Sequence, residues 1–117
     1  MHRILFSLAL TLLSGLAMAQ TQTLVTGTIR DLNAVGSAGH APDNLDIRVY
    51  LAGVNTFCPA TTDAGFGYIN VDDANFKGIV AMLSLADATG KQVSIYSVPT
   101  ASSVGSFCQI AWVHVLN

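Results

Sequence analysis

The chain has 117 residues, of which 51% are hydrophobic and 10% are charged, and its formal net charge at pH 7 is −2. A nucleic-acid-binding protein needs clustered Lys and Arg to neutralise phosphates. The five basic residues here are scattered along the chain, so the composition argues against a nucleic-acid partner. A chain of this length provides one domain with a modest hydrophobic core.

The first 19 residues have the layout of a secretory signal peptide. A basic start at Arg3 precedes an apolar run from Ile4 to about Leu16, and the small residue Ala19 marks the cleavage point. The run is shorter than the ~20 apolar residues that a membrane-spanning helix needs. We therefore expect cleavage after Ala19, no membrane span, and a single secreted or periplasmic domain over residues 20–117.

Both cysteines of the chain, Cys58 and Cys108, lie in the part that would be exported. An oxidising compartment favours a disulfide over free thiols or a metal site. The sequence therefore predicts a Cys58–Cys108 disulfide, which would stabilise the domain by about 4 kcal/mol through loop-closure entropy.

The first two predicted elements are strands. Residues 21–30 alternate between small or hydrophobic side chains and Thr or Arg, which is typical of a half-buried strand. Gly27, in the middle of this strand, indicates a bulge or a close backbone approach. Residues 31–44 are rich in Gly, Ala and Asn and predict a loop. A second alternation over 45–51 predicts a strand with four inward side chains: Leu45, Ile47, Val49 and Leu51.

A short third strand is expected over residues 66–71, after which the pattern changes to a helical period. Hydrophobic side chains recur at three- and four-residue steps over residues 76–86. Asp72 or Asp73 is expected to cap the N-terminus of this helix. Gly90 is expected to end it, because glycine readily takes the left-handed conformation just beyond a helix.

Two further strands follow the helix. One covers residues 91–96 with Val93 and Ile95 inward, and the last begins at Cys108. The order of three strands, a helix and two strands is that of the OB-fold, a five-stranded Greek-key barrel. We therefore predict a mainly β fold, with a closed OB-fold barrel and one helix between its third and fourth strands. The alternative is an open α+β sandwich.

The predicted helix is apolar on two sides, because small and apolar residues also occupy the side away from the core. A helix of this kind is usually buried on both sides. The outer side is either an interface in a ring or dimer of identical chains or a surface covered by loops. The residues of the outer side are Ala74, Gly78, Ala81, Met82, Leu85 and Ala88.

Several short motifs, in this order, resemble the subtilase cytotoxin B subunit family of cell-binding proteins. They are VTGTI on the first strand, FC before the middle segment, a helix ending in TG, KQVSIY followed by a proline, and a late cysteine. These B subunits belong to toxins with one catalytic A chain on a ring of five B chains. The resemblance implies an OB-fold that forms a pentamer with its helices around a central pore. It also implies binding of sialylated glycans on the side of the barrel and a catalytic A subunit as partner.

The resemblance also implies where a ligand would bind. Thr26 takes the position of a family serine that contacts sialic acid, so a hydroxyl is retained. Ser97 stands where the family has a tyrosine. The segment between Tyr96 and Cys108 is shorter than in the family.

A sugar site needs an aromatic face to pack against the ring and nearby hydroxyl or amide groups. The strand alternation provides outward residues of both kinds, and the resemblance adds Ser97. The alternative interpretation is that the two tyrosines are cross-strand packing pairs and that the tryptophan belongs to the core. The candidate ligand-binding residues are Thr26, Thr28, Tyr50, Ser94, Tyr96, Ser97 and Trp112.

The sequence contains no recognisable catalytic or metal-binding motif. His40 and His114 have no third ligand at a familiar spacing. The serine-hydrolase, zinc-protease, Walker and dinucleotide motifs do not occur. Helix capping explains the pair Asp72 and Asp73. We therefore expect no enzymatic activity, no catalytic residues, no cofactor and no metal.

Together these patterns indicate an exported OB-fold protein with one disulfide that binds a glycan or another small polar ligand, as a homo-oligomer. The alternative is a monomeric periplasmic interaction, structural or inhibitor module without a sugar site.

Overall fold

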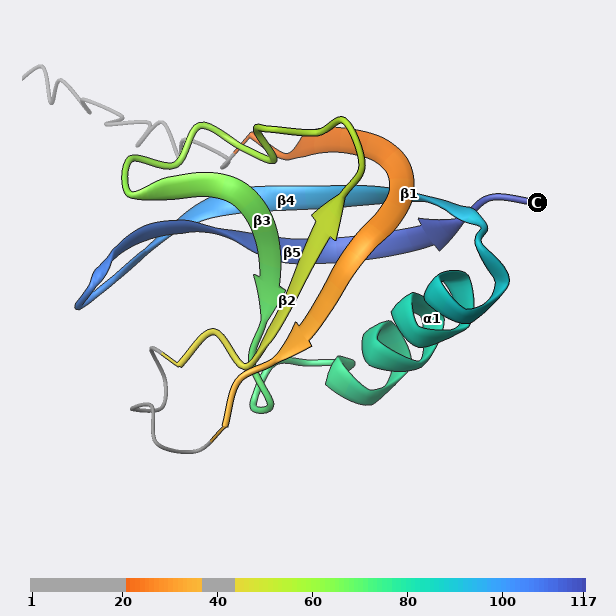
Figure 1. The fold of residues 1–117 in the computed structure, drawn as a ribbon. Coiled ribbons are helices and arrows are strands. Elements are labelled where there is room, and N and C mark those ends of the chain that lie inside the picture. The colour runs from red at the N-terminus through yellow and green to blue at the C-terminus, as the bar shows by residue number, and fades with distance from the viewer. Residues whose placement is uncertain (1–20, 37–43) are drawn as a thin grey trace, which may run out of the picture.

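The computed structural model describes residues 21–36 and 44–117, and within these ranges it contains five strands and one helix (Figure 1). The predicted signal peptide, residues 1–19, and His40 lie outside the described residues. The elements in chain order are β1 Thr23–Ala34, β2 Ile47–Leu51, β3 Asp63–Ile69, α1 Phe76–Thr89, β4 Gln92–Ser102 and β5 Gly105–Val115.

The five strands close into a barrel in the order β1-β2-β3-β5-β4. β3 and β5 pair in parallel, and the other neighbours pair antiparallel. With α1 between β3 and β4, this mainly β barrel confirms the predicted OB-like fold class, and the open sandwich is wrong. In Figure 1 the helix lies on one side of the barrel, and the β4–β5 hairpin extends on the opposite side.

β1 is longer than predicted because it pairs with two neighbours, β4 along its first half and β2 along its second. The register shifts between Ile29 and Asp31, as at a β-bulge, and the side-chain alternation is interrupted there. This interruption is the reason why residues 31–34 resemble a loop in the sequence. The close approach at Gly27 is confirmed, since a Cβ there would lie 3.3 Å from the carbonyl oxygen of Ala52.

β3 begins and ends earlier than the predicted strand over residues 66–71. The backbone leaves the sheet at Asn70 and Val71. Their N–H groups donate to the carboxylates of Asp73 and Asp46, at 2.7 and 2.8 Å. These side-chain acceptors replace the hydrogen bonds of a strand partner and turn the chain toward α1.

α1 begins without the predicted aspartate cap. Asn75 occupies the cap position in a left-handed conformation, with φ of 60° and no side-chain hydrogen bond to the helix. The Asp73 carboxylate is engaged with the preceding turn instead. The predicted C-terminus is confirmed, because Gly90 caps the helix with φ of 67°.

β4 and β5 form a longer hairpin than predicted. Their pairing continues to Ser102 and Gly105, well beyond the expected strand end at Tyr96. The register shifts between Tyr96 and Ser97, and this second irregularity interrupts the sequence pattern in the same way as the first.

The main core fills the inside of the barrel, and α1 packs on it through Leu83 and Ala86. The predicted inward residues Val49, Leu51, Val93 and Ile95 are all fully buried. Leu45 differs from the prediction. It lies before β2 with φ of 52° and is buried in a second, smaller cluster with Phe66 and Tyr68.

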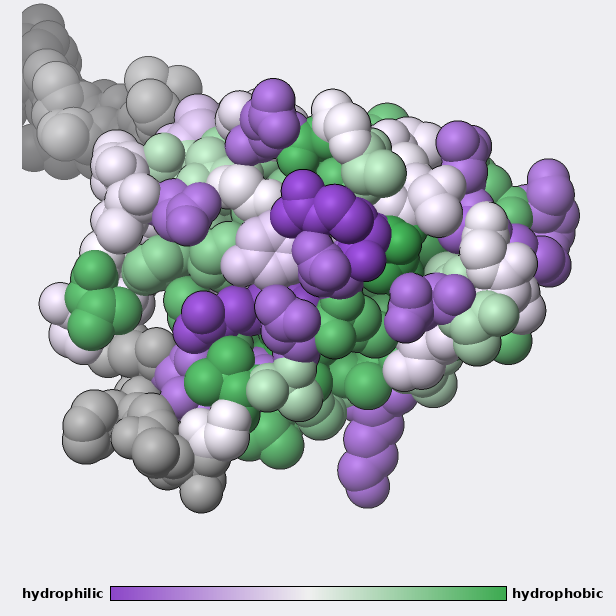
Figure 2. All heavy atoms as spheres, viewed as in Figure 1, coloured by the Kyte–Doolittle hydropathy of each residue, from purple (hydrophilic) through white to green (hydrophobic). Residues whose placement is uncertain are grey.

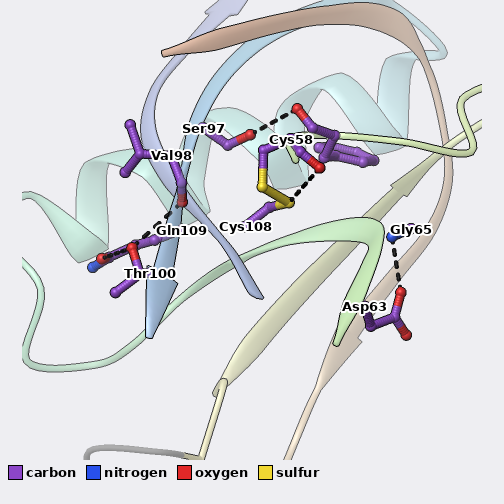
Figure 3. The surroundings of a disulfide bond; sticks show 9 residues. Cys58, Asp63, Gly65, Ser97, Val98, Thr100, Cys108 and Gln109 are labelled. Carbon is purple, nitrogen blue, oxygen red and sulfur yellow. Dashed lines mark hydrogen bonds between the residues drawn. A yellow bond between two sulfur atoms is a disulfide. The ribbon is translucent and has the colours of Figure 1, made fainter. Parts of the chain in front are cut away.

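The predicted disulfide between Cys58 and Cys108 is confirmed (Figure 3). Its Cα atoms are 5.7 Å apart, and both residues are fully buried in the main core. The bond joins the segment between β2 and β3 to β5, so it links two parts of the barrel that lie 50 residues apart in the chain.

The outer side of α1 is exposed, as far as the described residues extend. Met82 is 38% exposed and Leu85 is 58% exposed, and Gly78, Ala81 and Ala88 are exposed beside them. The interpretation that loops cover this side is therefore wrong for the described part of the chain. No helix in residues 21–36 and 44–117 has the length and apolar character needed to cross a membrane.

Removing both sulfurs should lower the stability of the domain markedly. A Cys58→Ala/Cys108→Ala variant should lose about 4 kcal/mol of unfolding free energy, because the unfolded chain regains the freedom that the cross-link removes. Urea unfolding of the variant and the oxidised protein measures this difference. Wild-type protein treated with reductant serves as a control and should match the variant. Equal unfolding midpoints for the oxidised protein and the variant would contradict the prediction.

Candidate ligand-binding surface

Three neighbouring strands, β1, β4 and β5, bring most of the candidate residues together on the outside of the barrel. The strand register aligns them in two adjacent rows that cross the strands. Leu24, Tyr96 and Trp112 form an apolar row, and the next row has polar side chains at Thr26, Ser94 and His114. We call these two rows the β1–β4–β5 face.

The apolar row contains a stacked aromatic pair. The rings of Tyr96 and Trp112 have centroids 4.0 Å apart and planes inclined by 26°. Leu24 is 48% exposed and Trp112 is 41% exposed. The interpretation of Trp112 as a core residue is therefore wrong, whereas Tyr96 does pack across the strands as a pair with Trp112. The row presents flat apolar surface to the solvent.

The polar row places hydrogen-bonding groups directly beside this surface. The hydroxyl groups of Thr26 and Ser94 are hydrogen-bonded to each other at 2.8 Å. The imidazole ring of His114 is exposed, and its centroid lies 6.4 Å from that of Trp112. Thr28, which pairs with Gln92, continues the polar surface along β1.

The face carries no permanent charge among the residues of its two rows. Its polar groups are two hydroxyls, an imidazole and the tyrosine hydroxyl. Lys91, directly before β4, donates from its ammonium group to the side-chain oxygen of Asn117 at 3.4 Å. The face therefore suits a neutral ligand better than an anion.

Tyr50 lies apart from this face, on β2. Its ring centroid is 5.4 Å from that of Phe66, and the Arg30 guanidinium lies over the ring at 5.4 Å. Figure 2 views the molecule from the side of β1, β2 and β3, where strongly hydrophilic side chains gather near the centre among hydrophobic ones. Tyr50 therefore belongs to a surface other than the β1–β4–β5 face, where it contacts Phe66 and Arg30.

Ser97 points into the barrel. It is fully buried, and its hydroxyl donates to the carbonyl oxygen of Phe57 at 3.1 Å (Figure 3). Ser97 is therefore a structural residue that a surface ligand does not reach. The alternation that turns Tyr96 outward already indicated an inward Ser97, and only the resemblance had placed it in the site.

Two residues of the face were missed in the sequence analysis. Leu24 was not considered, and His114 was considered only as a metal ligand. His114 is two residues from Trp112 on the same strand, so the alternation contained a signal for it. Leu24 required the register between β1 and β4, which the sequence does not provide.

The described residues contain no group of three His, Cys, Asp or Glu side chains arranged to hold a metal ion.

Comparisons with known proteins identify no relative, since no protein-family model, no curated protein and no solved structure matches this chain.

The exposure of the aromatic pair can be measured directly, because Trp112 is the only tryptophan in the sequence. Acrylamide should quench its fluorescence readily in the folded protein, since the ring is 41% exposed. Replacing Tyr96 by Ala should increase the quenching constant by uncovering the stacked side of the ring. Tyr50→Ala, on the other surface, is the matched control and should leave it unchanged. A tryptophan that resists quenching, as in a protein core, would contradict the assignment.

Proposed function

We propose that this protein is an exported OB-fold carbohydrate-binding protein that recognises a neutral sugar on its β1–β4–β5 face. The observation that carries the proposal is the stack of half-buried Tyr96 and exposed Trp112 beside the hydrogen-bonded Thr26–Ser94 pair. In a cleaved and exported chain this face would be available to glycans outside the cytoplasm.

The chemistry of the face matches that of a sugar ring. One side of a pyranose presents C–H groups that pack on an aromatic surface, while its hydroxyls need hydrogen-bonding partners at the edge. The apolar row offers the first surface, and Thr26, Ser94 and His114 offer the second. The two rows have no Arg or Lys to pair with a carboxylate, so a neutral sugar fits better than the sialic acid that the family resemblance implies.

The outer side of α1 supports assembly into a homo-oligomer as part of the same proposal. Met82 and Leu85 expose apolar surface that association would remove from water. A shallow site binds one sugar weakly, and several copies in one assembly gain affinity when they engage a multivalent surface. A pentamer and an A subunit remain expectations from the resemblance.

A second candidate function is a monomeric module that binds another protein. The exposed side chains of Leu24 and Trp112 favour it, because an aromatic residue within an apolar patch is also typical of protein-binding hot spots. The two functions differ in whether free sugar competes for the face.

Sugar binding can be tested by titrating the mature protein with neutral and sialylated oligosaccharides and following the Trp112 fluorescence or the heat released. We expect Trp112→Ala to weaken binding at least tenfold through loss of the packing surface. Thr26→Ala and Ser94→Ala should each weaken it roughly three- to tenfold, since each removes a hydrogen bond.

Leu85→Ala on α1 serves as the control for this titration and should bind like the wild type. No response to any neutral or sialylated glycan would overturn the proposal. Binding of a sialylated glycan that Trp112→Ala leaves unaffected would place the site elsewhere.

Export and assembly can be tested together by native mass spectrometry of protein recovered from outside the cytoplasm. We expect a subunit that begins at Gln20 and a complex of several subunits. Leu85→Asp should dissociate the complex, because it buries a charge at the interface. Asn55→Asp adds the same charge on an exposed loop and should leave it intact. A wild-type protein that is monomeric at high concentration would contradict the assembly.

A further inference from the structure

A half-open pocket of about 200 Å³ lies between the turn that follows β3 and the β4–β5 hairpin. Segments far apart in the sequence line it, including Asp73 before α1, Thr100 on β4 and Gln109 on β5. It shares no residue with the β1–β4–β5 face. The volume holds roughly six or seven waters, at about 30 Å³ each, which is close to the size of one pyranose ring.

The floor of the pocket is fixed and partly apolar. Leu45 and Tyr68 are each 4% exposed, and both belong to the smaller hydrophobic cluster beside β3. Asn70, at 8% exposure, closes the floor beside them. A ligand would therefore meet a floor that does not need to be ordered on binding.

The polar wall is held by a chain of hydrogen bonds. The Gln109 side-chain amide donates to the Asp73 carboxylate at 2.9 Å, and the Thr100 hydroxyl donates to the Gln109 oxygen at 3.1 Å. Figure 3 shows the Thr100–Gln109 part of this chain. The second oxygen of Asp73 accepts the backbone N–H of Asn70 at 2.7 Å. Each carboxylate oxygen has two lone pairs, so Asp73 can still accept hydroxyl groups from a ligand.

The charge of the pocket is negative. Asp72 and Asp73 line it, and no Lys or Arg of the described residues does. Asp72 has no hydrogen bond or ion pair among the described residues. An anionic ligand would be repelled here, whereas a neutral polyol is accepted and an ammonium group is attracted.

We propose that this pocket is a second binding site, which takes a single pyranose-sized polyol and prefers an amino sugar over its neutral and acidic counterparts. The ring sits over the rigid floor, and its hydroxyls bind the Asp73–Gln109 wall. The ammonium group lies near the two aspartates. This inference does not rest on the sugar site of the β1–β4–β5 face.

The test is an NMR titration of the Trp112→Ala protein, in which any sugar binding at the β1–β4–β5 face is weakened and its resonances are distinct from those of the pocket. The probes are glucosamine, glucose and glucuronic acid. We expect millimolar binding of glucosamine, weaker binding of glucose and none of glucuronic acid. The side-chain amide of Gln109 and the backbone amide of Asn70 should shift.

Two variants separate the contributions of charge and hydrogen bonding. Asp72→Asn, which breaks no hydrogen bond of the described structure, should weaken glucosamine binding toward the level of glucose and leave glucose binding unchanged. Gln109→Ala should abolish the response to glucosamine and to glucose while its spectrum remains that of a folded protein. Leu85→Ala, on α1, is the control and should titrate like its parent.

The proposal is overturned if tens of millimolar glucosamine leave the pocket resonances unchanged, or if glucuronic acid shifts them as strongly as glucosamine. Shifts confined to residues outside the pocket would also overturn it. Because Trp112 is already replaced, failure of the proposed sugar face leaves this result unaffected.

Discussion

Closure of the barrel by β1 is the constraint on which the other features depend. β1 pairs with β4 along its first half and with β2 along its second, and the bulge between Ile29 and Asp31 lets one strand serve both. Without this double pairing the sheet would have two open edges. The Cys58–Cys108 disulfide adds a covalent link inside the same barrel.

The hydrogen bonds between the strands also explain how the side chains of the β1–β4–β5 face are brought together. Hydrogen-bonded strands hold side chains in opposite positions about 5 Å apart, which brings Tyr96 against Trp112 and Thr26 against Ser94. These side chains contact each other without a ligand, so binding of the proposed sugar would cost little conformational entropy.

Three surfaces of the domain differ in chemistry although all are supported by one barrel. The β1–β4–β5 face is aromatic and uncharged, and the pocket beside the hairpin is lined by Asp72 and Asp73. The outer side of α1 is apolar, with Leu85 exposed. The three surfaces can differ in chemistry because side chains that point outward from the strands and the helix do not have to fit into the packed core.

The order of elements, the inward positions Val49 and Ile95, the Gly90 cap and the disulfide partners were predictable, since each depends on local periodicity or on a pair of residues. The ends of β1 and β4 were not predictable, because a bulge in each strand interrupts the side-chain alternation although the strand pairing continues beyond it. The sequence by itself thus determined the fold class and which candidate side chains face outward. Only the tertiary structure decided which of them share a surface, because strand register and barrel closure depend on contacts between residues distant in the chain.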